Sequence, residues 1–298
     1  MPRTKTRRAG EKLLRRVRKQ RLRSVTIFPS LVTLLNGVCG FAAIAAAGSD
    51  KKAFALAGYL IVLAMIADML DGRLARMSHN TSSFGGQLDS LCDVISFGVA
   101  PAFIMLRMLE YKLVALAELY PGGAAFLRRF IWLAAAAYIV CAVIRLARFN
   151  VENEQDESAH MSFMGLPSPA AAGVVISLII FHQEALGEFT TKDTLLYSVC
   201  ENAIVYALPF AALASAVLMV SRITYPHVLN QYIRGKKPFA HFIKVLLLLG
   251  LIIWSRQTAL VIMFCGFAAA GFAKWLYYRI LGPRFAIRRQ LRTAELTE

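Results

Sequence analysis

The feature that most constrains the fold of this chain is a series of apolar runs, each close to the roughly 20 residues that a helix needs to cross a bilayer. Hydrophobic residues make up 57% of the sequence, which is too many for an ordinary soluble domain. We therefore predict an all-α, polytopic membrane bundle. Eight spans are expected, at about residues 29–48, 53–76, 87–109, 129–149, 166–183, 203–222, 241–255 and 257–277. Because the run at 241–255 is short, a re-entrant segment or an arrangement of six spans plus a hairpin are alternatives.

Basic residues are distributed in a way that predicts the topology. Lys and Arg together number 34 against 18 acidic residues, and residues 1–27 form a strongly basic arm before the first apolar run. Leu13, Leu14 and Val17 recur at helical spacing in this arm, which is typical of an amphipathic segment in the headgroup plane. Anionic headgroups explain the arm more economically than nucleic acid does. The positive-inside rule then places both termini in the cytosol, and we expect an integral protein of a bacterial inner membrane.

Four carboxylates interrupt this apolar pattern between the second and third spans. Asp68 and Asp71 are three residues apart, and Asp89 and Asp93 are four apart, so each pair shares one face of a helix. The polar stretch at 77–86 is long enough to reverse the chain and bring the two pairs together at the cytosolic side. Ionisable groups in membrane helices are costly, and their default interpretation is functional.

The chemistry of these side chains favours metal-assisted phosphate transfer. Carboxylate oxygens suit Mg²⁺ or Mn²⁺, and no His or Cys has the spacing of a zinc site. Two such ions commonly clamp the attacking and leaving oxygens of a phosphoryl centre. Gly72 and Ala75 are small enough for a diphosphate to approach the backbone, and Arg76 offers a planar donor fork.

The complete pattern is DxxDG, two residues, AR, eight residues, G, three residues, D, three residues, D. It runs without a gap from Asp68 to Asp93 and resembles the signature of the CDP-alcohol phosphotransferase family. The resemblance implies that Asp68, Asp71 and Asp89 bind two divalent ions with help from Asp93, which is also the general base. It implies further that the nucleotide-activated lipid is held by Gly72, Ala75, Arg76, Ser82, Gly85, Thr33 and Asn36. Ser30 stands where this family usually has Asn.

Four further stretches, SFGVAPA, RLARFN, GLPSPAAAG and LMVSRITYP, resemble the phosphatidylserine synthase branch of that family. Its members transfer a phosphatidyl group from CDP-diacylglycerol to the hydroxyl of L-serine and release CMP. Candidates for holding the acceptor or the lipid phosphate are Arg145, Arg148 and Asn150, although positive-inside anchoring explains the two arginines equally well. The resemblance also suggests a homodimer.

Three segments are expected: the basic arm at 1–27, a six-helix catalytic membrane domain at 28–226, and two additional helices with a basic tail at 227–298. Two other functions stay open at this point. The acceptor could be glycerol 3-phosphate or an inositol phosphate, which would require extra basic groups near the site. A membrane cation transporter could also use the acidic cluster, but it gives no reason for Gly72, Ala75 and Arg76.

Overall fold

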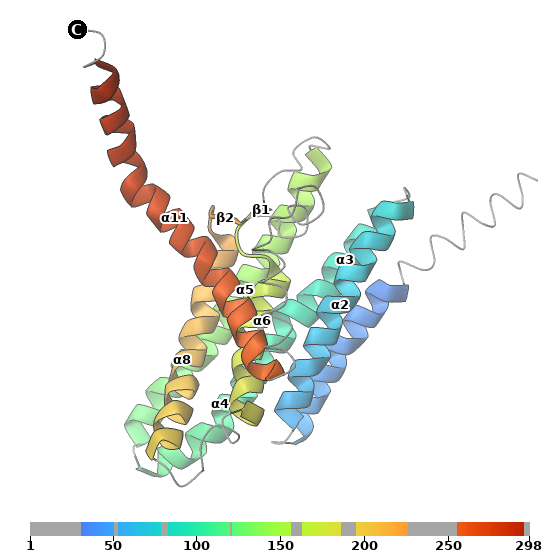
Figure 1. Ribbon diagram of the computed structural model, residues 1–298. Coiled ribbons are helices and arrows are strands. Elements are labelled where there is room, and N and C mark those ends of the chain that lie inside the picture. Colours follow the sequence, from blue (N-terminus) through green and yellow to red (C-terminus); the bar gives the residue numbers. More distant parts are fainter. Residues whose placement is uncertain are drawn as a thin grey trace, which may run out of the picture.

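Helices form nearly all of the structure, a computed structural model that describes residues 31–50, 53–78, 83–119, 121–155, 163–185, 195–225 and 255–294. The prediction of an all-α bundle is confirmed for these residues, with one two-residue strand pair as the addition (Figure 1). We call the helix Leu31–Ser49 the N-terminal helix. The other elements are α2 Phe54–Ser78, α3 Ser83–Asp93, η2 Val94–Val99, α4 Ala100–Leu119, α5 Pro121–Gln155, β1 Phe163–Met164, α6 Ser168–Ile180, η3 Phe181–Ala185, α8 Leu195–Val220, β2 Thr224–Tyr225 and α11 Arg256–Ala294.

Six helices in the described part of the chain are long and apolar enough to cross a membrane. They coincide with the expected spans 1, 2, 3, 4, 6 and 8, and the chain is therefore a polytopic integral membrane protein. The expected fifth span forms α6, of 13 residues, followed by the five-residue η3. The expected seventh span and the basic arm lie almost entirely outside the described residues.

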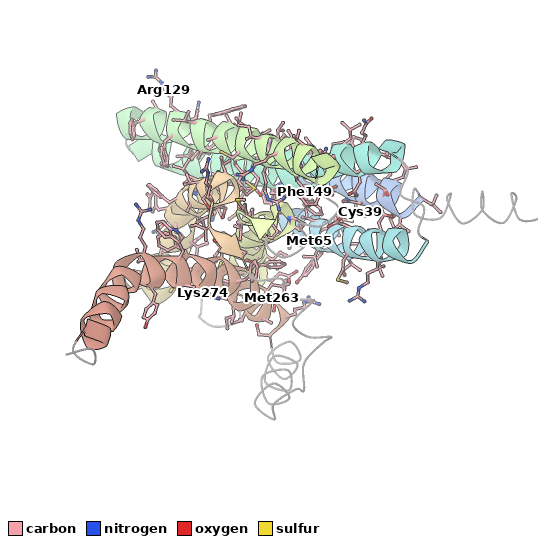
Figure 2. The ribbon with its side chains drawn as sticks, turned by 90° about the horizontal axis from the view of Figure 1, so that it is seen from above. Cys39, Met65, Arg129, Phe149, Met263 and Lys274 are labelled. Carbon is pink, nitrogen blue, oxygen red and sulfur yellow. The ribbon has the colours of Figure 1, made fainter. Side chains whose placement is uncertain are left out.

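The centre of the bundle is α6. Ten of its residues are buried, on all of its faces, as expected for a helix that is apolar all round. The longer helices α2, α4, α8 and α11 pack around it, and α5 and α11 lie on opposite sides of the bundle (Figure 2). Gly173 of α6 makes room for the ring of Phe264 from α11, since a Cβ at this position would lie 2.2 Å from that ring. The last helix is thus closely packed against the core.

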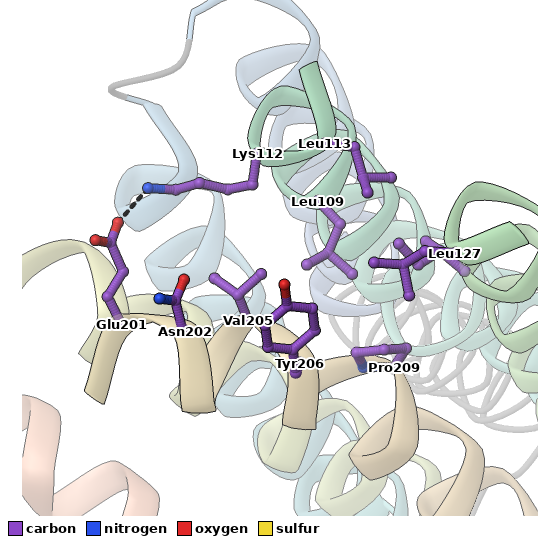
Figure 3. Close-up of a pocket in the computed structure, with 10 residues that line it drawn as sticks. Leu109, Lys112, Leu113, Leu127, Glu201, Asn202, Val205, Tyr206 and Pro209 are labelled. Atoms are coloured by element: carbon purple, nitrogen blue, oxygen red, sulfur yellow. Dashed lines mark hydrogen bonds and ion pairs between the residues drawn. The ribbon is translucent and has the colours of Figure 1, made fainter. Parts of the chain in front are cut away.

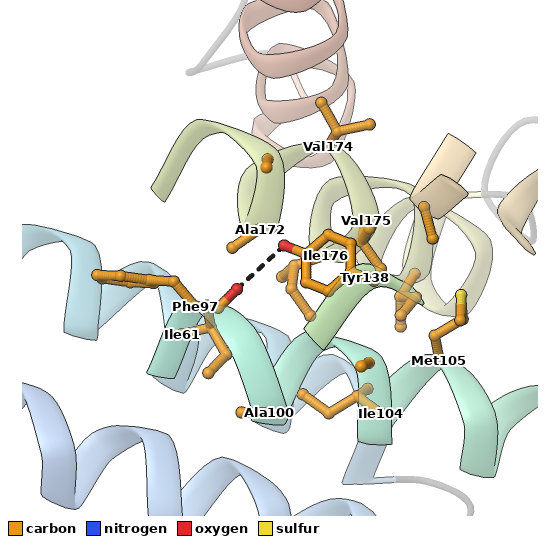
Figure 4. Packing of buried hydrophobic residues seen from close by; sticks show 14 of the residues in the cluster. Ile61, Phe97, Ala100, Ile104, Met105, Tyr138, Ala172, Val174, Val175 and Ile176 are labelled. Atoms are coloured by element: carbon orange, nitrogen blue, oxygen red, sulfur yellow. Dashed lines mark hydrogen bonds between the residues drawn. The ribbon is translucent and has the colours of Figure 1, made fainter. Parts of the chain in front are cut away.

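A π-helical segment, η2, follows directly after Asp93 and was not predicted from the sequence. Pro101 begins the next turn, and it has no N–H to offer the carbonyl of Phe97, its partner in a regular α-helix. The buried hydroxyl of Tyr138 donates to that carbonyl instead, at 3.0 Å (Figure 4). A side chain of α5 therefore supplies the hydrogen bond that the proline removes, which matters because lipid offers none.

Several helices are longer than their apolar runs. The third span was expected to end near residue 109 and the fourth to begin near 129, but α4 continues to Leu119 and α5 begins at Pro121. The stretch between them, residues 110–128, contains four Leu, four Ala and two Glu, which are good helix formers. Hydropathy marks only the membrane-embedded part of a helix and misses such extensions.

The short sheet joins the start of α6 to the end of α8. Phe163 pairs with Tyr225 and Met164 with Thr224 in antiparallel register. Gly165 follows with φ +85°, and a side chain there would meet the carbonyl oxygen of Met219 at 2.2 Å, so only glycine fits. This turn fixes where α6, and with it Ser168, begins.

The N-terminal helix approaches α3 and η2 closely through two glycines. A Cβ on Gly37 would lie 2.9 Å from Sγ of Cys92, and one on Gly40 would lie 2.4 Å from Oγ and 2.8 Å from Cα of Ser96. Small residues at such crossings let membrane helices pack backbone to backbone. This approach brings Thr33 and Asn36 to the acidic residues.

We expect Gly40→Ala to destabilise the protein by about 1–3 kcal/mol, because the added methyl meets backbone atoms that cannot move aside. Thermal unfolding in detergent would measure the change. Gly48→Ala, on the same helix with no atom within 4 Å of the new Cβ, is the matched control and should be neutral. Equal stability of the two variants would contradict the close helix crossing.

Candidate active site

Three of the four motif carboxylates meet at one end of the bundle. Asp68 from α2 and Asp89 and Asp93 from α3 each offer an oxygen, and these oxygens lie within 4.8 Å of one another. The convergence predicted from the spacing is therefore present for these three carboxylates. In the described part of the chain no Lys or Arg lies within 4.0 Å of these three carboxylates. One oxygen of Asp89, Oδ1, is buried and has no hydrogen-bond partner there.

The donor set fits a divalent cation. Three carboxylates at this separation repel one another strongly when all are charged, since the surrounding protein screens charge poorly. A hard cation with oxygen ligands would offset this repulsion and would also satisfy the orphaned oxygen of Asp89. The site is thus chemically suited to Mg²⁺ or Mn²⁺.

Asp71 lies beside this group but is held differently. It is buried, and its Oδ2 accepts a hydrogen bond from the hydroxyl of Thr33 on the N-terminal helix. Asp71 still interacts electrostatically with Asp68 and Asp89.

Asp93 is held by a second donor from the same helix. Nδ2 of Asn36 donates to Oδ1 of Asp93 at 2.9 Å, and both side chains are buried. Thr33 and Asn36 were expected beside the nucleotide from the family resemblance. The structure places them on two of the aspartates, an arrangement that depends on the N-terminal helix crossing α3 and has no signal in the local sequence.

The three candidate acceptor residues on α5 separate in space. Arg145 is close enough to Asp68 and Asp93 to interact with their charges; its Nη1 donates to the buried Oγ of Ser168 at 2.8 Å. Its Nε is buried without a partner in the described residues. Arg148 contacts Sδ of Met164 at 3.2 Å. Asn150 exchanges hydrogen bonds of 2.9–3.0 Å with Ser90. Arg145 is thus the candidate that the described contacts link to the aspartates.

The remaining motif residues lie around the junction of α2 and α3. Gly72 is exposed, with open space where a side chain would be. Ala75 and Arg76 belong to the last turns of α2, although their side chains are outside the described part. Gly85 lies in the first turn of α3. Ser82 falls outside the described residues.

A cavity of about 270 Å³ lies elsewhere in the bundle, between α4, α5 and α8 (Figure 3). Leucines line much of it, and an ion pair between Lys112 and Glu201 lies at its edge. Leu109 is 16 residues beyond Asp93, or about 24 Å along a helix. The cavity is therefore near the opposite end of these helices and does not belong to the acidic site.

Fold and site together define a polytopic membrane protein with a carboxylate cluster, built from two successive spans, that is suited to divalent cations. Residues 26–220 match the family model described as CDP-alcohol phosphatidyltransferase, and the chain belongs to this family. It is similar to proteins named CDP-diacylglycerol–serine O-phosphatidyltransferase from several organisms. The Helicobacter pylori protein is 32% identical over 85% of this chain and 93% of its own length. The Methanocaldococcus jannaschii protein is 31% identical over 70% of this chain and 79% of its own length. The Saccharomyces cerevisiae protein is 34% identical over 49% of this chain and 51% of its own length.

Proposed function

We propose that this protein transfers a phosphatidyl group from CDP-diacylglycerol to the hydroxyl of L-serine, giving phosphatidylserine and CMP. The observation that carries the proposal is the meeting of Asp68, Asp89 and Asp93 in a chain of the CDP-alcohol phosphatidyltransferase family. Its relatives' names supply the particular lipid and alcohol.

Asp68, Asp71, Asp89 and Asp93 would hold two Mg²⁺ or Mn²⁺ ions. Ions held by these carboxylates would supply charge neutralisation for the diphosphate and for the leaving CMP. The orphaned Oδ1 of Asp89 supports this assignment. It is also supported because, in the described residues, no Lys or Arg lies within 4.0 Å of the three clustered carboxylates. The cytidine side of the substrate is assigned to Gly72, Ala75, Arg76, Ser82 and Gly85. The open space around Gly72 leaves room for it.

The reaction is a single displacement. Asp93 accepts the proton of the serine hydroxyl as the oxygen attacks the phosphorus that bears diacylglycerol. A new P–O bond forms to serine, the bond to the bridging oxygen breaks, and CMP takes the electron pair with it. No covalent bond to the protein is needed, and the fixed geometry of base and substrate contributes much of the rate.

Arg145 is proposed to hold the serine carboxylate or the lipid phosphate. Its guanidinium is near Asp68 and Asp93, and Ser168 holds it from one side through Nη1. A planar fork of donors suits either anion. Arg148 and Asn150 are proposed to contribute less directly to holding the acceptor or the lipid phosphate, because Arg148 contacts Met164 and Asn150 is hydrogen-bonded to Ser90.

The lipid bilayer itself supplies CDP-diacylglycerol, with the acyl chains between helices. We propose that the site faces the cytosol of a bacterial inner membrane, with both termini on that side, because the basic arm and tail favour this orientation. We also propose that the protein is a homodimer. Its chain is assigned to three segments: the basic arm at 1–27, the catalytic membrane domain at 28–226, and the additional helices with the basic tail at 227–298.

The acceptor is tested by giving the purified protein labelled CDP-diacylglycerol with L-serine, glycerol 3-phosphate or an inositol phosphate, with Mg²⁺ or Mn²⁺ and with EDTA. We expect CMP and a labelled phosphatidyl product with serine and a divalent ion only. Turnover with a phosphorylated alcohol instead would make the protein another member of the family. Metal flux into liposomes without release of CMP would identify a transporter.

A further inference from the structure

The side chain of Asn36 is completely buried and contacts the acidic site directly. Its Nδ2 donates to Oδ1 of Asp93 at 2.9 Å. Asn36 belongs to the N-terminal helix, whereas Asp93 is the last residue of α3. The hydrogen bond therefore joins two separate helices at the carboxylate that we assign as the general base.

The direction of this hydrogen bond is fixed by chemistry. A charged carboxylate only accepts hydrogen bonds, so the Asn36 amide must present its N–H₂ to Asp93. The opposite orientation would place two partially negative oxygens in contact in a buried site. The amide oxygen of Asn36 has no partner among the described residues. Within the described part of the chain, the bond to Asp93 is thus the one hydrogen bond of this amide.

The backbone of Asn36 lies at the crossing with α3 and η2. Oγ of Ser96, from the π-helical turn after Asp93, donates to the backbone carbonyl of Asn36 at 2.9 Å. The next residue, Gly37, packs against Cys92 with no room for a side chain. The backbone of Asn36 is therefore packed against α3 and η2, and from there its side chain reaches Asp93.

We propose that Asn36 is a positioning residue for Asp93. This inference rests on the proposed function, and it differs from the nucleotide contact that the family resemblance suggested for Asn36. By occupying Oδ1, the amide fixes the plane of the carboxylate and leaves Oδ2 directed to the serine hydroxyl. A free carboxylate would rotate and would share its oxygens among the neighbouring charges.

Thr33 has a parallel position one helical turn earlier. Its hydroxyl donates to Asp71, and residues 33 and 36 lie on one face of the N-terminal helix because they are three apart. One face of this helix therefore supplies a hydrogen-bond donor to an aspartate on α2 and to another on α3.

The test is a comparison of Asn36→Leu with the wild type in steady-state kinetics at saturating divalent ion. Leucine has a similar size and lacks the donor. We expect kcat to fall about 10- to 100-fold, as is typical when the partner of a reacting or ligating group is removed. The KM values for CDP-diacylglycerol and serine should stay near those of the wild type. Asn36→Asp keeps the size and replaces the donor by a second carboxylate, and it should lose at least as much kcat.

Ser96→Ala is the matched control, because it removes a buried hydrogen bond at the same helix crossing but leaves the amide of Asn36 in place. It should retain most of the wild-type kcat. If Ser96→Ala lost as much kcat as Asn36→Leu, a general loosening of the crossing would explain the result and the inference would fail. A raised KM for CDP-diacylglycerol with unchanged kcat would assign Asn36 to the nucleotide instead. If the wild-type protein had no activity with serine, the proposed function itself would be refuted. That outcome is distinguishable from a failure of the positioning role of Asn36, which is judged by comparing variants with an active wild type.

Discussion

Replacing Asp93 by Asn should lower kcat for CMP release by about 10²- to 10⁴-fold, the usual contribution of a general base. The serine hydroxyl is a poor nucleophile while it keeps its proton, and an amide cannot accept that proton. Asn has the same shape as Asp, and its side-chain oxygen can still accept the hydrogen bond from Asn36. The fold should therefore persist, and the loss should be one of chemistry.

The measurement is radiolabelled CMP release at saturating metal ion, together with thermal unfolding of the same samples. Asp50→Asn provides a control with an identical change in charge, on an exposed residue at the far end of the N-terminal helix. It should keep wild-type turnover. Near-normal turnover in Asp93→Asn would refute the assignment of the base.

Asp89→Asn should have two opposite effects. We expect activity at a fixed, limiting Mn²⁺ concentration to fall by about 10²-fold or more, because one ligand of a shared site is lost. In the absence of metal, the same variant should unfold at a higher temperature than the wild type. Three carboxylates within 4.8 Å repel one another, and removing one charge relieves that repulsion.

Thermal unfolding with EDTA and with Mn²⁺ checks this pair of effects. A ligand at about 100 times its Kd stabilises the folded state by about 2.7 kcal/mol, so Mn²⁺ should raise the unfolding temperature of the wild type much more than that of the variant. A variant that is less stable without metal and gains as much from Mn²⁺ as the wild type would mean that Asp89 is a structural residue.

Much of the fold could be predicted because a membrane span has a simple signature in sequence. Apolar runs of suitable length located the N-terminal helix and α2 to within a few residues. For α5 and α8 they located the membrane-embedded part of each helix. The π-helical turn after Asp93 was missed, because it depends on a proline and on the hydroxyl of Tyr138 from another helix. Long-range contacts of this kind leave no local periodicity.

The candidate active site was likewise predictable only in part. The three- and four-residue spacings of the aspartates predicted that two helices would bring them together, and Asp68, Asp89 and Asp93 do converge. The partners of the aspartates were not predictable. Thr33 and Asn36 of the N-terminal helix donate to Asp71 and Asp93, and glycines let this helix approach α3 and η2 closely. Tertiary packing decides such contacts.

The most direct test of the account is Mn²⁺ binding to the purified wild-type protein, followed by electron paramagnetic resonance. We predict two Mn²⁺ ions per chain with the magnetic coupling of a closely spaced pair, lost in Asp68→Asn and Asp89→Asn. A wild-type protein that binds no Mn²⁺, or that binds it equally well without these two carboxylates, would contradict the central claim that the acidic cluster is a metal site for phosphatidyl transfer.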